Sequence, residues 1–165
     1  MKRMRSLWMA AALVAVSHGL QAQGIEVKHL QPNAKLIFAE GVWAGDTLYL
    51  SGQMANPATP ADSAKGTPAV YGDTKTQAIS ALNKIQALLQ SQGLDMKDVV
   101  KMTAFLVADP ALGNKLDFAG FNAAYMQFFG TKEQPNKPAR SAMQAAALVT
   151  PWGLVEIDVI AVRSK

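Results

Sequence analysis

The chain has 165 residues, of which half are hydrophobic and 17% are charged, with 16 Lys and Arg residues against 12 Asp and Glu residues and no cysteine. This length fits one domain with a sizeable core, and the composition argues against intrinsic disorder. Because disulfide bonds and thiolate metal sites both need cysteine, both are excluded, and stability must come from core burial or from assembly.

The first 22 residues have the pattern of a secretory signal peptide. Three basic side chains within the first five residues precede an apolar run at 6–20, and Ala22 provides a small residue at a cleavage point. The apolar run is shorter than the about 20 residues that span a membrane. We therefore expect a signal peptide at 1–22, a mature domain at 23–165 and no stable membrane anchor after cleavage. An uncleaved anchor is the alternative.

Removal of the signal peptide changes the charge of the protein. The 16 basic residues lose three and the 12 acidic residues lose none, which leaves 13 against 12 and a net charge of +1. The mature chain has no basic stripe interleaved with aromatic residues, the pattern that follows a nucleic-acid backbone. We therefore expect a periplasmic or secreted protein that does not bind nucleic acid.

The first part of the mature domain is predicted to hold a short lead-in at 24–33, which is a candidate first strand, then two short strands and a loop. Residues 36–38 and 47–50 are β-prone runs, separated by residues 41–46, whose Gly-Asp pair is typical of a turn. Residues 54–67 collect proline, glycine and small polar side chains, which predicts a loop.

A helix is predicted between Thr74 and Gly93. Thr74 and Gln77 have the spacing of a capping box, in which the hydroxyl and the amide satisfy free backbone N–H groups. Apolar residues then recur at helical spacing, and Gly93 supplies the stop. These apolar residues are Ala78, Leu82, Ile85 and Leu89.

The second half of the mature domain is predicted to contain a strand at 99–107, a helix at 115–129 and a pair of strands, 139–149 and 154–162, around a turn at 150–153. Residues 94–98 and 131–137 connect these elements. The alternation in the first strand places four apolar side chains on one face, namely Val100, Met102, Ala104 and Leu106.

This order of elements indicates an α+β fold with two helices on one face of a mixed sheet. Apolar residues remain as candidates for the other face. They are Met143, Ala145, Ala147, Ile157 and Val159. Because two helices cover one face only, we expect another subunit to cover the second face.

Arg140 is the most informative single residue of the mature chain. The only other arginine there, Arg163, lies in the tail, where we expect a solvated charge. Arg140 stands at the entrance of an apolar run at 141–149, and an unpaired buried charge is very costly. Its planar fork suits a carboxylate held by two parallel hydrogen bonds. That carboxylate belongs either to a protein Asp or Glu or to a substrate.

Glu156 interrupts an otherwise apolar strand. Alternation places Glu156 and Asp158 on one face of this strand and the apolar side chains on the other. One interpretation is a solvent-exposed edge or a salt bridge to Arg140. The functional interpretation is a carboxylate that orients or deprotonates a water molecule in a cleft.

Other types of site lack their residues. His29 is the one histidine left after cleavage, so neither a His-rich metal site nor a Ser-His-acid triad is expected. No phosphate-binding glycine loop occurs, so we expect no nucleotide cofactor. Because the mature chain has one histidine and no cysteine, we also expect no metal. The aromatic residues of the second helix have core spacing and are interpreted as core. They are Phe118, Phe121, Tyr125, Phe128 and Phe129.

Five groups of short motifs, in this order, strongly resemble the RidA (YjgF) family over residues 36–163. They are Ser51-Gly52-Gln53, Gly93-Leu94-Asp95 with Val99-Val100-Lys101, Phe121-Asn122-Ala123-Ala124-Tyr125 with Phe128-Phe129, Pro138-Ala139-Arg140-Ser141, and Val155-Glu156-Ile157 with Ile160-Ala161-Val162. The resemblance implies a chorismate-mutase-like fold, assembled as a homotrimer with sites in clefts between subunits. It also implies hydrolysis of reactive 2-imino and 2-enamino acids, of the 2-aminoacrylate type, to 2-keto acids and ammonia without a cofactor.

The resemblance assigns roles to four residues. Arg140 stands where the family has its substrate-carboxylate arginine, and Glu156 stands where it has a water-associated glutamate. Ser51 matches the serine of the Ser-Gly-Gln segment, and Asn122 matches the asparagine that precedes the helical tyrosine. All four are therefore candidate site residues.

Two further site positions depart from the family pattern. Phe38 stands where a tyrosine is common, so the hydroxyl is missing, and this affects the expected substrate range and rate. Ala142 stands where a cysteine is common, but a backbone carbonyl at this position can still hold a water molecule.

The expected mechanism is simple, because an imine carbon is already electrophilic. Arg140 grips the substrate carboxylate and Glu156 positions one water molecule. The alternative function is a non-catalytic trimer outside the cytoplasm that binds small carboxylates or acts like a chaperone.

Overall fold

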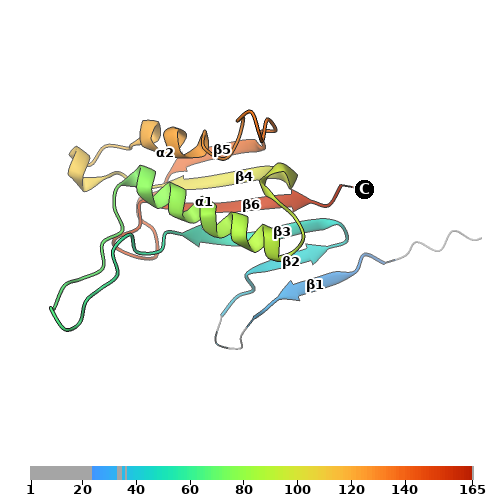
Figure 1. Cartoon of the computed structure of the whole chain (residues 1–165), viewed down its shortest axis with the longest axis horizontal. Coiled ribbons are helices and arrows are strands. Elements are labelled where there is room, and N and C mark those ends of the chain that lie inside the picture. The colour runs from blue at the N-terminus through green and yellow to red at the C-terminus, as the bar shows by residue number, and fades with distance from the viewer. Residues whose placement is uncertain (1–23, 33–34, 36, 165) are drawn as a thin grey trace, which may run out of the picture.

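The computed structural model describes residues 24–32, 35 and 37–164, so the expected signal peptide lies outside the described residues. The described chain forms one six-stranded sheet with two α-helices (Figure 1). The elements are β1 (Val27–Leu30), β2 (Gly41–Ala44), β3 (Thr47–Met54), α1 (Thr74–Ser91), β4 (Val99–Leu106), α2 (Phe118–Tyr125), β5 (Ala139–Gln144) and β6 (Val155–Val162). Short 3-10 helices lie at Met96–Asp98 and Pro110–Leu112.

The strand order is β1-β2-β3-β6-β4-β5, so the predicted pairing of the last two strands is wrong, because β4 lies between β6 and β5. All neighbouring strands are antiparallel except β4 and β5, which are parallel and are joined through α2. Helix α1 lies along β3 and β6, and α2 packs beside it over the β4 and β5 end of the same face (Figure 1). This arrangement confirms the predicted α+β fold with a mixed sheet. Among the described residues, no helix is long and apolar enough to cross a membrane.

Helix α1 begins one residue after Asp73, whose carboxylate accepts a hydrogen bond from the backbone N–H of Thr76 at 2.8 Å. Hydrogen bonds from Thr76 hold the pKa of Asp73 below its usual value. The capping box predicted at Thr74 was wrong, because the carboxylate one residue earlier takes the N-cap position. The predicted stop at Gly93 is confirmed by its left-handed backbone (φ +74°).

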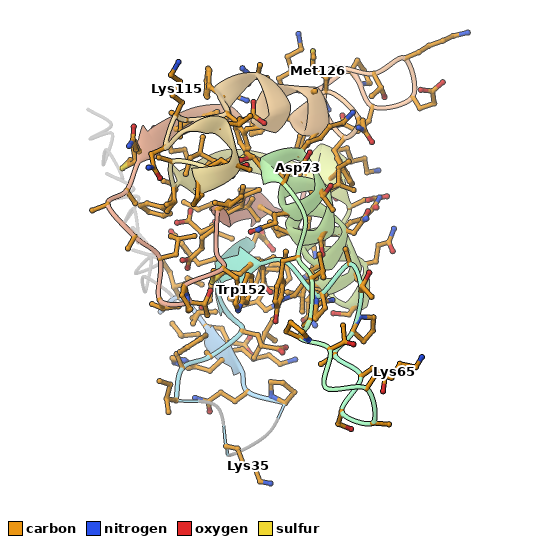
Figure 2. All side chains as sticks on the ribbon, turned by 90° about the vertical axis from the view of Figure 1, so that its left-hand side faces the viewer. Lys35, Lys65, Asp73, Lys115, Met126 and Trp152 are labelled. Carbon is orange, nitrogen blue, oxygen red and sulfur yellow. The ribbon has the colours of Figure 1, made fainter. Side chains whose placement is uncertain are left out.

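Gln77 makes contacts across the fold in place of the predicted cap. Its buried amide Nε2 donates to the carbonyls of Gly72 at 3.2 Å and Trp152 at 3.0 Å, and its Oε1 accepts from the N–H of Leu154 at 2.9 Å. The rings of Tyr71 and Trp152 stack beside it, with centroids 3.5 Å apart. Figure 2 shows Trp152 on the turn that precedes β6. Gln77 therefore ties the start of α1 to the start of β6.

The N-terminal strands differ from the prediction. Residues 41–44, expected as a separator, form β2, while Ile37 and Phe38 are not in a strand, and Leu36 lies outside the described residues. The predicted turn is confirmed, since Gly45 has a positive φ of 60° and joins β2 to β3 as a two-residue hairpin. Burial of Trp43 against the core gives β2 its tertiary support.

Strand β4 has a shift in its pairing with β6 between Val99 and Lys101. As predicted, Met102 and the next two inward residues are buried, but Val100 is 47% exposed and Val99 takes the inward position. A bulge exchanges the faces of the residues on either side of it, which explains the error at Val100.

The second helix and the fifth strand are shorter than predicted. Helix α2 begins after Asp117, whose carboxylate caps the N–H of Gly120 at 2.7 Å, and residues 126–129 continue as turns. Strand β5 ends at Gln144, so Ala145 and Ala147 lie beyond it.

The two faces of the sheet carry different residues from those predicted. Ile157 and Val159, expected on the uncovered face, are at most 1% exposed and belong to the core beneath the helices. The other face carries Tyr49 and Met143, both about half exposed, and the half-buried Ile160. Nothing in the described part of the chain covers this face.

Candidate active site

The guanidinium of Arg140 lies among three aromatic rings of α2. Its Cζ atom is 4.4 Å from the ring centre of Tyr125, 5.3 Å from that of Phe121 and 5.7 Å from that of Phe118. A helix brings residues three, four and seven positions apart to one side, so α2 presents all three rings to β5. Cation–π contacts of this kind hold a guanidinium without neutralising it.

Arg140 has no carboxylate partner among the described residues. Its Nη1 atom is buried and makes no hydrogen bond. An ion pair with a protein Asp or Glu, including the salt bridge to Glu156, is therefore not formed. A buried guanidinium N–H with no acceptor favours binding of an external carboxylate.

The Tyr125 phenol stays neutral beside this charge. Burial raises the pKa of Tyr125 above its usual value, while the positive charge of Arg140 acts in the opposite direction. Because the net shift is upward, the ring at neutral pH is an uncharged support for the guanidinium.

Asn122 and Ala142 lie near Arg140. Asn122 is half-buried and follows Phe118 by four residues on α2, and Ala142 follows Arg140 by two residues on the same side of β5. We call Arg140, Asn122 and Ala142 the arginine half-site.

Ser51 organises a second group of candidate residues. Its hydroxyl donates to the carbonyl of Ala39 at 2.7 Å, and its backbone N–H donates to the carbonyl of Glu40 at 2.9 Å. These bonds fasten the segment that follows Phe38, whose ring is 58% exposed, to β3. The hydroxyl proton of Ser51 is therefore used to hold this segment.

Glu156 lies on β6, opposite Met54 of β3 and Phe105 of β4. Its half-exposed carboxylate lies over the backbone of Gly52, where a Cβ atom would meet the Glu156 side chain. We call Phe38, Ser51 and Glu156 the glutamate half-site.

The two half-sites lie on opposite faces of the sheet. Arg140 is aligned with the buried Met102 of β4 and faces α2. Glu156 alternates with Val155 and Ile157, which are fully buried beneath the helices, so its side chain is on the other face. The six predicted site residues of one chain are therefore divided between the two half-sites, and Arg140 and Glu156 of the same chain do not meet.

Two hollows in the described part of the chain lie away from the two half-sites. One of about 510 Å³ lies between α1 and residues 56–58, and one of about 470 Å³ lies beside Arg163, and neither includes a residue of the two half-sites. Within the described ranges, no group of three or more His, Cys, Asp or Glu side chains is placed to hold a metal ion.

Two features escaped the sequence analysis. The rings of Phe118, Phe121 and Tyr125 were assigned to the core alone, although their common helix side was a usable signal for a cation partner. Arg163 is exposed, as expected of a solvated charge, but its Cζ atom also lies 4.4 Å from the ring centre of Trp43, and its Nη2 atom donates to the Gln92 carbonyl at 3.4 Å.

Known proteins match almost the whole described chain. The family model described as Endoribonuclease L-PSP matches residues 26–163. A putative reactive intermediate deaminase, TdcF of Escherichia coli strain K12, is 35% identical over 133 residues, which cover 81% of this chain and 92% of that protein. The 2-iminobutanoate/2-iminopropanoate deaminase of Salmonella typhimurium is 35% identical over 126 residues, 76% of this chain and 87% of that protein.

The solved structures agree. The crystal structure of Escherichia coli TdcF with bound serine matches with a TM-score of 0.60 at 32% identity, covering 86% of this chain and 99% of that chain. The match to the family model includes all the strands and helices that carry the two half-sites. The chain therefore belongs to the Endoribonuclease L-PSP family, the RidA (YjgF) family that its motifs resemble.

Proposed function

We propose that this protein hydrolyses reactive 2-imino and 2-enamino acids, of the 2-aminoacrylate type, to 2-keto acids and ammonia. The observation that carries the proposal is the buried Nη1 atom of Arg140, which has no acceptor in the described chain and is held in place by aromatic rings. The names of two relatives, a reactive intermediate deaminase and a 2-iminobutanoate/2-iminopropanoate deaminase, support the same chemistry.

In this mechanism Arg140 binds the substrate carboxylate through two parallel hydrogen bonds and so fixes the imine carbon in the cleft. Glu156 takes a proton from a water molecule as its oxygen adds to the imine carbon. In this step a protonated imine becomes a neutral carbinolamine. Glu156 then gives its proton to the amino nitrogen, ammonia leaves, and the hydroxyl proton is released as the carbonyl of the keto acid forms. An enamine first takes up a proton at carbon to become the imine. The imine carbon is electrophilic enough that these steps need neither a metal nor a cofactor.

The mechanism needs a second copy of the chain, because Arg140 and Glu156 of one copy face opposite ways. We propose a homotrimer in which each cleft combines the arginine half-site of one subunit with the glutamate half-site of its neighbour. The uncovered sheet face, with the exposed Tyr49 and Met143, supports such an assembly.

The two departures from the family pattern fit this site differently. Ala142 keeps its backbone carbonyl, which can hold the attacking water molecule. Phe38 offers an exposed apolar ring without a hydroxyl, so we expect a substrate range shifted toward apolar side chains.

The test is semicarbazide competition on imines that an amino-acid oxidase produces, with and without the purified mature protein. Hydrolysis lowers the yield of semicarbazone. An unchanged yield with all imines tested would contradict the deaminase assignment, and Arg140→Ala serves as the matched inactive control.

The second candidate function is binding of small carboxylates without catalysis, including a chaperone-like role outside the cytoplasm. The TdcF structure that contains serine supports it, because serine carries the carboxylate that an unpaired Arg140 would bind. A pure binder would show carboxylate affinity by calorimetry that disappears in Arg140→Ala, with no hydrolysis by the wild type.

For the location we propose export with cleavage after Ala22, which the basic and apolar pattern of the first 22 residues supports. Intact-mass measurement of protein from an extracytoplasmic fraction tests it. A mature chain beginning at Gln23 is expected, and a full-length mass there would contradict cleavage.

A further inference from the structure

Position 52 requires glycine because there is no room for a Cβ atom, and not because of its backbone conformation. Six other glycines in the described ranges, including Gly45 and Gly93, have positive φ angles that other residues adopt only with strain, but Gly52 does not. A Cβ atom at Gly52 would instead collide with the Glu156 carboxylate, touching Oε1 and lying 2.9 Å from Cδ and 3.0 Å from Cγ. The backbone conformation at position 52 is therefore compatible with alanine, but the place that the Glu156 side chain occupies is not.

The pairing of β3 with β6 creates this close approach. Met54 is opposite Glu156 and Gln53 is opposite Ile157, but the register shifts between Leu50 and Gln53. The shift leaves Gly52 in the irregular part of β3, on the side to which Glu156 points. The missing side chain then lets the carboxylate rest on the strand backbone.

We propose that Gly52 is a positioning residue for Glu156. Because Gly52 has no side chain, the Glu156 carboxylate lies against the strand backbone, in the position from which it can reach a water molecule in the cleft. Any side chain at position 52 forces the Glu156 side chain to rotate away from the strand. Proton transfer requires hydrogen-bond distance between the carboxylate and water, so rotation of the carboxylate away from the water slows the chemical step. Substrate binding through Arg140 of the neighbouring copy is left unchanged.

The inference rests on the proposed function for its kinetic test only, and the position of the carboxylate can be tested without activity. The variants are Gly52→Ala, Glu156→Gln, Glu156→Asp and the two combinations with Gly52→Ala. The matched control is Gly24→Ala, where the same added methyl group meets no atom within 4 Å and φ is not positive.

We expect Gly52→Ala to lower kcat about 10- to 100-fold, within the range for general acid–base groups, with KM changed less than about twofold. Gly24→Ala should match the wild type. In the Glu156→Gln background, Gly52→Ala should cause no further loss, because the group on which it acts is already disabled. An unchanged kcat in Gly52→Ala, or an equal loss in both backgrounds, would overturn the proposal.

If the wild type hydrolyses no imine, the proposed function fails, and crystal structures of the wild type and Gly52→Ala decide the positioning role. A displaced Glu156 carboxylate in an otherwise unchanged subunit supports it, and an unmoved carboxylate overturns it. If Gly52→Ala does not fold, the shorter side chain in Gly52→Ala/Glu156→Asp relieves the contact and should restore folding. A double variant that also fails to fold would overturn the proposal.

Discussion

Arg140 places its Cζ atom 4.4 Å from the ring centre of Tyr125, and this stacking holds the guanidinium where an ion pair would otherwise be expected. The ring supports the charge without competing for its hydrogen-bonding edge. The hydrogen-bonding capacity of the guanidinium is thus left for a carboxylate that is not part of the described chain.

Replacement of Arg140 by alanine should therefore lower kcat/KM by about 100-fold or more, since a buried charged contact of this kind is worth several kcal/mol. Arg140→Lys should recover little, because an ammonium keeps the charge but not the planar fork. Steady-state kinetics give the effect, and circular dichroism and light scattering should show a folded trimer. Unfolding of Arg140→Ala would identify the arginine as a structural residue.

Replacement of Glu156 by glutamine should separate binding from chemistry. The amide keeps the size and hydrogen bonds of the side chain but cannot take a proton, so kcat should fall about 100-fold or more. Affinity for a product keto acid, measured by calorimetry, should stay within about twofold of the wild type. A variant with full kcat would show that another group activates the water.

A shared cleft predicts complementation between inactive subunits. When Arg140→Ala and Glu156→Gln subunits are unfolded together and refolded as a mixture, some clefts receive Arg140 and Glu156 from different chains and are intact. We expect the mixture to regain activity that neither variant shows alone. Mixed trimers that remain inactive would place both groups in the same subunit's site.

Gln77 should be one of the most sensitive positions for stability. Its truncation to alanine removes three hydrogen bonds and leaves the buried N–H of Leu154 without an acceptor, at a cost of about 2–4 kcal/mol in the free energy of unfolding. Gln90→Ala, an exposed change on the same helix, is the control and should change stability by less than about 0.5 kcal/mol. Urea denaturation measures both, and equal effects would contradict the role assigned to Gln77.

Tyr125 predicts how stability responds to alkaline pH. Its pKa is raised in the folded chain, so the folded state holds the phenol proton more tightly than the unfolded state does. The resulting stability is fully present below the ordinary tyrosine pKa of about 10 and is lost as pH rises through the folded value. Thermal unfolding measured from about pH 8 to about pH 11 should show a smaller loss of stability with rising pH in Tyr125→Phe than in the wild type. Identical declines would mean that the phenol does not contribute.

Periodicity in the sequence was sufficient to predict the buried positions where burial follows the local hydrophobic pattern. The four apolar positions predicted for the inner side of α1 are all buried, and Met102 faces the core as predicted. Val100 was misplaced because a bulge in the β4–β6 pairing depends on the partner strand, which the local pattern does not contain. Strand β2 was missed for a related reason, since it is stabilised by β1, β3 and the burial of Trp43.

The candidate residues could be identified one by one, but their grouping could not. Alternation separated Glu156 correctly from Ile157, yet nothing in the sequence says which side of β6 the helices cover. The sequence analysis put Ile157 on the wrong side of the sheet, and the salt bridge from Glu156 to Arg140, kept there as one interpretation, is not formed within the described chain. The resemblance to the family supplied the expectation of clefts between subunits, with which the separation of the half-sites is consistent.

Strand β6 is the last strand of the chain but lies between β3 and β4 in the sheet. The first five strands therefore cannot form a continuous sheet until residues 155–162 have been synthesised. A growing chain on the ribosome has only two partial sheets, β1-β2-β3 and β4-β5, with the edges that β6 later joins still open. Termination before residue 155 should consequently leave aggregation-prone fragments, and not a slightly smaller domain.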